Sequence, residues 1–380
     1  MKPLLACIAF FTFAISGWAQ GPSAPPISQV FAFYCNSDYS SCPDGFQPAL
    51  GPVQLSDGNF YGTTWYGNTD TDLGTVWQAT PSGDVKVLYT FTPNGEGQYV
   101  HGSLPAVGFA AGADGNLYGV TLEGGTQNNG VFYRITTGGK LKVLYNFCSL
   151  SGCADLGAPI VLAKNGNFYG ITANLVFKLT SKGVWSQLYG FPSTEEGIEL
   201  IAGSDGNLYG VAGSLPWDTS KESVFRLSTS GKYTVLHTFP KLDRVSALTR
   251  SSSGTLYGVF CCGTNTGIFQ INSAGKYKIV QKTPPDTFAP SLLVPGSDGN
   301  LYGLITDGSE YPGYVLAISP KGTTIFSEEF DCNSDGCDPL SLIEASDGNF
   351  YGLTAVGGTV SEGDNPDGTI FKLATGLKGR

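Results

Sequence analysis

The hexapeptide DGNFYG occupies residues 57–62 and returns unchanged at residues 347–352. Five close variants stand between these copies: DGNLYG at 114–119, 205–210 and 298–303, NGNFYG at 165–170, and SGTLYG at 253–258. The tyrosines of successive copies are 57, 51, 40, 48, 45 and 49 residues apart. A period of this size is the length of a four-stranded propeller blade, so seven copies predict seven blades.

The remainder of each repeat supplies the other strands. An apolar segment such as GTVWQAT (74–80) follows the hexapeptide, and a glycine-containing turn then leads to a segment such as VKVLYTF (85–91). Glycine supplies the positive φ that short hairpin turns require. We interpret the hexapeptide as architectural: Asp-Gly-Asn forms a turn, the aromatic pair packs on both sides of a buried strand, and the last glycine relieves crowding.

The last repeat lacks a fourth strand after GTIFKLATG (368–376). SQVFAFYC, at residues 28–35, matches KVLYNFC (142–148) including the trailing cysteine, so we expect strand 28–35 to complete the last blade, residues 340–374. The sequence therefore predicts an all-β fold: a single seven-bladed β-propeller of four-stranded antiparallel blades over residues 20–380, closed into a ring without open edges.

The composition favours export and disfavours nucleic acid as a partner. Residues 1–19 combine an early lysine, an apolar run and small residues at Gly17 and Ala19, which is typical of a signal peptide cleaved after Ala19. We therefore expect a secreted or periplasmic protein without membrane insertion. The formal net charge of −10 and pI near 4.7 would repel a phosphate backbone.

The repeat resembles that of the GloVer tandem-repeat proteins of bacteria, which reads approximately DGNFYGTT, a Gly-Gly loop, GTVFKLTPSG and VLYSF. This resemblance implies a propeller and bacterial export, and it brings no established activity or catalytic residues. DGNLYG is also similar to the DGNLWF repeat of streptogramin lyases, seven-bladed propellers that use a catalytic histidine and a metal ion. This chain holds only His101 and His237, and His237 stands in a fourth strand where most copies have tyrosine. We therefore do not expect the lyase site to carry over.

The two faces of the expected ring differ. The turns between first and second strands, and between third and fourth strands, are short and uniform, and we call their side the turn face. The loops between second and third strands and the links between blades vary in length, and we call their side the loop-rich face. Variable loops on a rigid scaffold usually carry binding or catalysis, so the loop-rich face is the expected working face.

The cysteines lie on the loop-rich face. Cys35 with Cys42, Cys148 with Cys153, and Cys332 with Cys337 each follow a fourth strand and enclose a short link, which predicts three local disulfides in an exported protein. Cys261 and Cys262 are adjacent, and no other mature cysteine is left to pair with either, so we predict a strained bond between these neighbours.

Aromatic and acidic side chains also gather in these loops. Exposed tyrosine and tryptophan rings stack on sugars, which makes the following residues ligand-binding candidates: Trp65, Tyr66, Tyr99, His101, Trp217 and Tyr311. The weaker catalytic candidates are the carboxylates Asp70, Asp72 and Asp364. Asp331, Asn333 and Asp335 copy the first half of a calcium loop, but its twelfth position is Leu342 instead of glutamate, so calcium is a weak candidate.

These features favour a secreted binding module that recognises a glycan or an exported protein through its loop-rich, disulfide-stapled face. Two alternatives stay open: a glycoside hydrolase or polysaccharide lyase that uses loop-face carboxylates, and a structural scaffold of an envelope assembly. We expect a monomer with no cofactor, apart from the weak calcium candidate.

Overall fold

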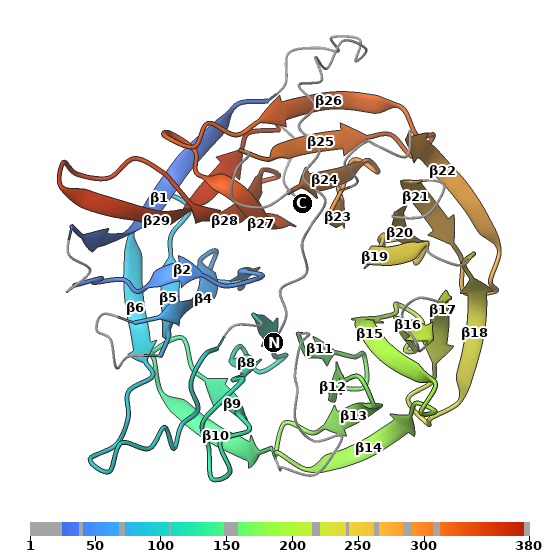
Figure 1. The fold of residues 1–380 in the computed structure, drawn as a ribbon, viewed down its shortest axis with the longest axis horizontal. Helices are drawn as coiled ribbons and strands as arrows, with labels where there is room; N and C mark the ends of the chain where they lie inside the picture. The colour runs from blue at the N-terminus through green and yellow to red at the C-terminus, as the bar shows by residue number, and fades with distance from the viewer. Residues whose placement is uncertain are drawn as a thin grey trace, which may run out of the picture.

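The computed structural model describes residues 25–37, 41–67, 73–105, 108–147, 159–214, 221–240, 243–261, 266–283, 290–306 and 312–375. These residues form seven antiparallel sheets that stand as blades around a central axis (Figure 1). Within each blade the strands follow one another from the centre of the ring to its rim. The predicted seven-bladed, all-β propeller is confirmed. In the described part of the chain, no helix is long and apolar enough to cross a membrane.

Blade 1 consists of β2 (Phe46–Pro48), β3 (Val53–Gln54), β4 (Phe60–Tyr66), β5 (Thr75–Ala79) and β6 (Val85–Thr90). Blade 2 consists of β7 (Phe109–Ala111), β8 (Leu117–Val120), β9 (Val131–Ile135) and β10 (Leu141–Asn146). Blade 3 consists of β11 (Val161–Leu162), β12 (Phe168–Ile171), β13 (Leu175–Leu179) and β14 (Trp185–Gly190). Blade 4 consists of β15 (Glu195–Ala202), β16 (Leu208–Ser214), β17 (Glu222–Leu227) and β18 (Tyr233–Thr238).

Blade 5 consists of β19 (Arg244–Arg250), β20 (Leu256–Cys261), β21 (Thr266–Ile271) and β22 (Tyr277–Thr283). Blade 6 consists of β23 (Leu292–Pro295), β24 (Leu301–Ile305), β25 (Tyr314–Ile318) and β26 (Thr324–Glu329). Blade 7 consists of β27 (Cys337–Glu344), β28 (Phe350–Val356), β29 (Asp364–Leu373) and the N-terminal strand β1 (Ile27–Asn36).

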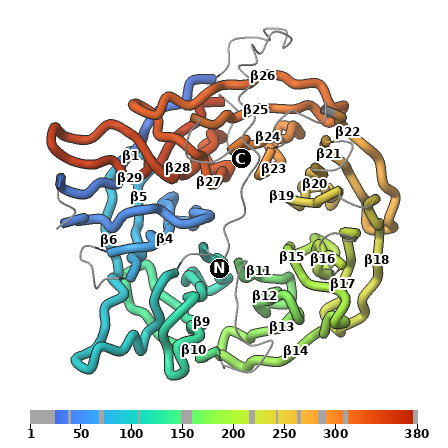
Figure 2. The backbone as a smooth tube through the Cα atoms, in the orientation of Figure 1, coloured from blue at the N-terminus to red at the C-terminus, as the bar shows by residue number. Residues whose placement is uncertain are grey.

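The N-terminal strand closes the ring as expected, and Figure 2 shows β1 beside β29, at the opposite end of the described chain. The predicted alignment of Cys35 with Cys148 is wrong by one residue. Phe31 pairs with Ile370 in the ladder, as Tyr145 pairs with Phe132 in blade 2. This register gives Phe33 the position of Phe147. The register of the ladder follows the aromatic positions of the strand and not the position of its cysteine.

The Asp-Gly-Asn turn forms as predicted. In the first copy, the amide of Leu55 donates to the carbonyl of Asn59 at 3.1 Å, and Gly58 adopts a φ of 82°. The structure adds a bond that the sequence analysis missed, because the Tyr61 hydroxyl donates to Asp57 Oδ2 at 2.6 Å. Burial acts to raise the pKa of Asp57, but hydrogen bonds from Tyr61 and Asn59 outweigh it and lower the pKa.

The last glycine of each hexapeptide faces the same position of the neighbouring strand in every blade. It lies directly opposite the middle of the third strand, where six blades carry an aromatic ring and blade 6 carries leucine. The pairs are Gly62–Trp77, Gly119–Tyr133, Gly170–Phe177, Gly210–Phe225, Gly258–Phe269, Gly303–Leu316 and Gly352–Phe371. In the six aromatic pairs, a Cβ on the glycine would overlap the facing ring. The predicted relief of crowding is therefore confirmed.

The hydrophobic core is divided among the gaps between blades. The described buried residues form seven clusters, and each cluster draws side chains from two neighbouring blades. Closure of the ring creates the cluster between blades 7 and 1, in which Phe33 packs 5.7 Å from Trp77, centroid to centroid. Because every blade is buried on both sides, the ring is a rigid support for its loops.

Candidate functional site

The loop-rich face of blade 1 presents a pair of stacked rings. Phe46 in β2 pairs with Tyr66 at the end of β4, and the two ring centroids lie 4.9 Å apart with planes at 20°. Tyr66 is 36% exposed, and the neighbouring Trp65 is half-buried. The structure therefore gives the predicted Tyr66 a partner, Phe46, that the sequence analysis missed because Phe46 stands in a link outside the repeat.

A disulfide fixes the approach of the chain to this ring pair. Cys35 and Cys42 are bonded, and the amide of Asn36 donates to the carbonyl of Ser41 within the loop that they enclose. The next turn is held by the amide of Gly45, which donates to the carbonyl of Cys42 at 2.9 Å. The short loop thus positions Phe46 beside Tyr66.

The predicted disulfides are confirmed where the structure describes both cysteines. Cys35 is bonded to Cys42, and Cys332 is bonded to Cys337. The predicted pair Cys148–Cys153 lies outside the described residues, and so does Cys262. Cys261 ends β20, and its bond to Cys262 stays a prediction. The two disulfides observed are consistent with an oxidising, extracellular or periplasmic compartment.

An Asp-Gly step follows the Cys35–Cys42 loop, another lies within the Cys332–Cys337 loop, and each step packs on a pair of threonines. In blade 1, Thr75 Oγ1 donates to the carbonyl of Asp44 at 3.3 Å and lies 2.8 Å from Thr64 Oγ1. In blade 7, Thr369 Oγ1 donates to the carbonyl of Asp335 at 2.7 Å. A Cβ on Gly336 would overlap the hydroxyl of Thr354, so only glycine fits under this step. The sequence signal for this Asp-Gly contact with the threonines is an Asp-Gly that follows or lies within a cysteine loop.

The calcium candidates take part in a local turn. The amide of Asn333 donates to Asp331 Oδ1 at 3.0 Å, and the amide of Asp331 donates to Asp335 Oδ2 at 3.3 Å. Burial raises the pKa of the Asp335 carboxyl. In the part of the chain that the structure describes, no three His, Cys, Asp or Glu side chains are grouped to hold a metal ion.

Two further aromatic candidates lie in the link from β6 to β7. His101 is exposed, and its Nδ1 lies 2.7 Å from the Tyr89 hydroxyl. Tyr99 accepts hydrogen bonds at its carbonyl from the amides of Gly102 and Gly125. The structure thus pairs His101 with Tyr89 and Tyr66 with Phe46. The candidates Trp217 and Tyr311 lie outside the described residues.

The catalytic candidates are not brought together by the described structure. Asp364 begins β29, pairs with Asn36 in the ladder, and lines a shallow groove of about 460 Å³ beside Tyr34. It is the one carboxylate among the described residues that line this groove. Asp70 and Asp72 lie outside the described residues.

A buried glutamate and a partly buried one between blades 4 and 5 were missed by the sequence analysis. Glu222 is only 3% exposed, and it accepts a hydrogen bond from Arg244 Nη1 at 2.9 Å. Glu199 Oε2 accepts the amide of Leu248 from the neighbouring blade at 3.0 Å. Burial raises the pKa of Glu199 to about 7. Sequence gave no signal for these bonds, because each joins residues of different repeats.

The raised pKa of Glu199 makes stability depend on pH. Since the folded-state pKa lies near 7 and the ordinary value is 4.5, the protein should lose stability as the pH rises between these values. Glu199→Gln keeps an acceptor for Leu248 but cannot ionise. We expect the variant to exceed the wild type by on the order of 2 kcal/mol at pH 8, with little difference at pH 4.5.

Urea denaturation of both proteins across this pH range checks the prediction. The matched control is Glu96→Gln, which removes the same charge from an exposed link. A stability difference between wild type and Glu199→Gln that does not change with pH would contradict the assignment.

Comparisons with known proteins agree with the fold. A structure of streptogramin B lyase superposes with a TM-score of 0.61 and 14% identity, covering 93% of this chain and 99% of that chain. Virginiamycin B lyase from Staphylococcus aureus gives a TM-score of 0.56 and 15% identity, covering 87% and 94%. The extracellular domain of a hybrid two component system from B. thetaiotaomicron gives 0.56 and 10%, covering 90% and 40%. At these identities the likeness shows the fold alone.

The sequence itself identifies the family. No curated protein matches this chain significantly. The Gloeobacter/Verrucomicrobia repeat matches residues 28–212 and 105–271, which together span more than half of the chain. His101 lies in the link after blade 1, and His237 lies in β18 of blade 4. This chain is a seven-bladed β-propeller that belongs to the Gloeobacter/Verrucomicrobia repeat family.

Proposed function

We propose that this propeller is an exported binding module that recognises a glycan through the stacked Phe46–Tyr66 pair of its loop-rich face. The observation that carries the proposal is an exposed tyrosine ring, backed by a second ring and delivered by a disulfide-closed loop. Tyrosine combines a large apolar face with a hydroxyl, which suits the C–H faces and hydroxyl groups of a sugar.

The backbone of this ring pair is ordered before a ligand binds, and this favours binding. Phe46 and Tyr66 are partners in the β2–β4 ladder, so the backbone of both residues is already fixed. The Cys35–Cys42 bond restricts the loop that precedes β2. Groups that are fixed before binding lose less conformational entropy when the ligand arrives, and affinity is correspondingly higher.

The predicted compartment supports a ligand from outside the cell or from the envelope. Residues 1–19 have the pattern of a signal peptide, and two local disulfides suit an oxidising compartment. Polysaccharides and exported proteins are the macromolecules available there. The ring pair favours the polysaccharide.

A glycan array tests the proposal. We expect the wild type to retain one class of polysaccharide and Tyr66→Ala to bind it about fivefold more weakly, because a stacked ring contributes on the order of 1 kcal/mol. Tyr66→Phe keeps the ring and should retain most of the affinity. Loss of binding in both variants alike would assign the effect to the hydroxyl instead of stacking.

Two results would reject the glycan. One is the absence of retention across a broad panel of neutral and acidic polysaccharides. The other is equal affinity of the wild type and Tyr66→Ala. If an exported protein is captured instead, and Tyr66→Ala releases it, the same ring pair serves a protein partner.

A further inference from the structure

The sector formed by the outer strands of blade 4 and by blade 5 carries a local excess of positive charge in an acidic protein. Residues 221–283 contain only two acidic residues, Glu222 and Asp243, and nine basic residues: Lys221, Arg226, Lys232, Lys241, Arg244, Arg250, Lys276, Lys278 and Lys282. The whole chain has 21 basic and 31 acidic residues. One sector of the ring is therefore electropositive while the rest is strongly acidic, and this sector attracts anions.

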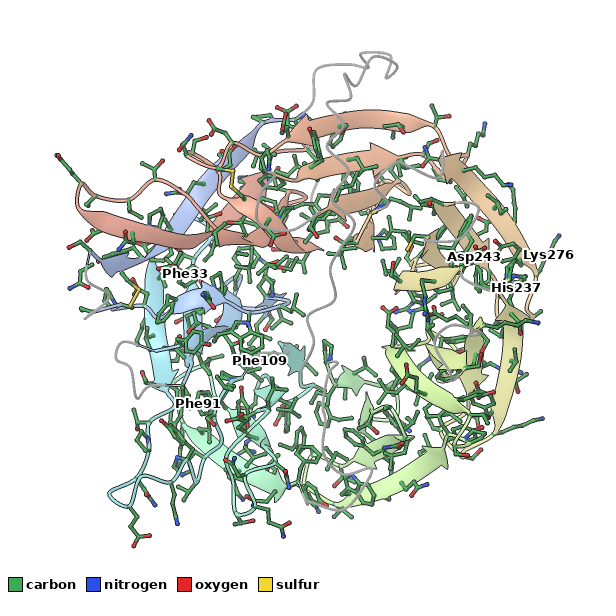
Figure 3. The ribbon with its side chains drawn as sticks, in the orientation of Figure 1. Phe33, Phe91, Phe109, His237, Asp243 and Lys276 are labelled. Atoms are coloured by element: carbon green, nitrogen blue, oxygen red, sulfur yellow. A yellow bond between two sulfur atoms is a disulfide. The ribbon has the colours of Figure 1, made fainter. Side chains whose placement is uncertain are left out.

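A groove of about 540 Å³ lies in this sector, at the junction of blades 4 and 5. Its apolar wall includes Phe260, Tyr277 and Ile279, and two lysines, Lys221 and Lys282, also line it. Figure 3 shows His237 and Asp243 on the same side of the ring, where β18 meets blade 5. The groove thus combines an apolar wall with groups of both charges.

The wall is set by a ring stack between the blades. His237 of β18 lies on Tyr277 of β22, with centroids 3.9 Å apart and planes at 3°. The preceding gap has the equivalent stack of Tyr189 and Tyr233, at 4.5 Å and 5°. Burial lowers the pKa of His237, so its imidazole is neutral at neutral pH. The stack is a regular packing feature, and it fixes the positions of both residues in the wall of the groove.

Asp243 is the unusual member of the groove. It is 6% exposed, and its carboxylate has no hydrogen bond or ion pair within the described residues. Glu222, the other buried acid in this sector, is by contrast paired with Arg244 and with the amide of Val245. Buried carboxylates normally have donors. The carboxylate of Asp243 is therefore available to donors of a ligand.

The two lysines are equally available. Lys221 and Lys282 are exposed, and among the described residues neither forms an ion pair with Asp243 or with any other carboxylate. Two unpaired cations at the exposed side of the groove and one unpaired carboxylate inside it suit a ligand that carries both an acidic group and hydrogen-bond donors.

We propose that this groove binds a uronic acid unit of an acidic polysaccharide. The sugar carboxylate pairs with Lys221 and Lys282, sugar hydroxyls donate to Asp243, and the C–H face of the ring lies against the wall around Tyr277. A bare phosphate satisfies the lysines but is repelled by Asp243, and a neutral sugar leaves both lysines unpaired. This site is separate from the Phe46–Tyr66 pair and does not rest on the function proposed for that pair.

Titration calorimetry with polygalacturonate tests the proposal, and fully methyl-esterified polygalacturonate is the neutral isostere. We expect the acidic form to bind at least about tenfold more tightly than the ester, because two charge contacts are lost with the ester. The double variant K221Q/K282Q should lose about tenfold in affinity and much of its salt dependence. Asp243→Asn should lose about fivefold or more while the melting temperature is maintained.

The control double variant K86Q/K142Q removes two exposed lysines from β6 and β10, and it should bind like the wild type. Tyr66→Ala should also keep this binding, which separates the failure of this site from the failure of the loop-face proposal. Equal binding of acid and ester, an equal loss in the control variant, or equal binding of dextran sulfate with no effect of Asp243→Asn would overturn the proposal. Absence of binding to polygalacturonate, alginate and hyaluronan alike would overturn it too.

Discussion

Replacing Gly170 with alanine should lower the free energy of unfolding by about 3 kcal/mol, whereas Gly303→Ala should stay within about 1 kcal/mol of the wild type. Both glycines end a hexapeptide, and both stand in the second strand of a blade. Neither has a positive φ. The difference therefore comes from the facing residue alone.

Gly170 lies directly opposite Phe177, and a Cβ at Gly170 would overlap the Phe177 ring well inside 3.0 Å. Gly303 lies opposite Leu316, and the atom nearest to its Cβ would be Pro290 Cβ at 3.2 Å. An added methyl group in a filled core forces rings and backbone to shift, and overpacking of this kind destabilises a domain. Blade 6 shows that leucine leaves room.

The double variant Gly170→Ala/Phe177→Leu places leucine opposite residue 170, as in blade 6, and should recover part of the lost stability. Guanidinium denaturation, followed by intrinsic fluorescence, measures all three proteins. Equal losses for Gly170→Ala and Gly303→Ala would show that the glycines are needed for backbone freedom and not for ring packing.

Phe33→Ala should destabilise the protein as strongly as Phe91→Ala, by about 3 to 5 kcal/mol. Phe91 directly follows the fourth strand of blade 1, is fully buried, and packs 5.5 Å from Tyr133 of blade 2. Phe33 holds the equivalent place on the N-terminal strand, is also fully buried, and packs on Trp77 of blade 1. Figure 3 marks both phenylalanines at successive blade gaps.

Comparing Phe33→Ala with Phe91→Ala shows whether β1 holds the ring closed or detaches from it. If β1 holds the ring shut, the two variants lose equal stability in a single cooperative denaturation transition. If β1 detaches easily, Phe33→Ala costs far less than Phe91→Ala, because its side chain is already free in part of the population.

Much of the fold was predictable because each local signal agreed with the repeat. The Asp-Gly-Asn sequence of residues 57–59 suits one turn conformation. The number of hexapeptide copies gives the number of blades. The bond from Tyr61 to Asp57 was missed, although the sequence carries its signal: an acid four residues before the tyrosine. Asn165 preserves the contact in blade 3 by donating to Tyr169 at 2.8 Å.

The candidate site was less predictable because it depends on residues outside the repeat. Tyr66 was identified at the end of a known strand, but Phe46 stands in a link whose path only the structure shows. The sequence does not distinguish Asp243 from other acids between strands, and its burial lies at the junction of blades 4 and 5. Contacts between repeats have no fixed spacing, so pattern analysis along one chain does not find them.

The proposals assign different roles to the two parts of the ring: the repeated hexapeptides build the support, and the parts in which repeats differ bind ligands. Amide hydrogen exchange, measured with and without the polysaccharide that the wild type retains most strongly, tests this division directly. Protection on binding should concentrate in residues 41–48 and 64–67 or in residues 221–224 and 237–245, with no change in the seven hexapeptide turns. Protection concentrated in those turns would contradict the account.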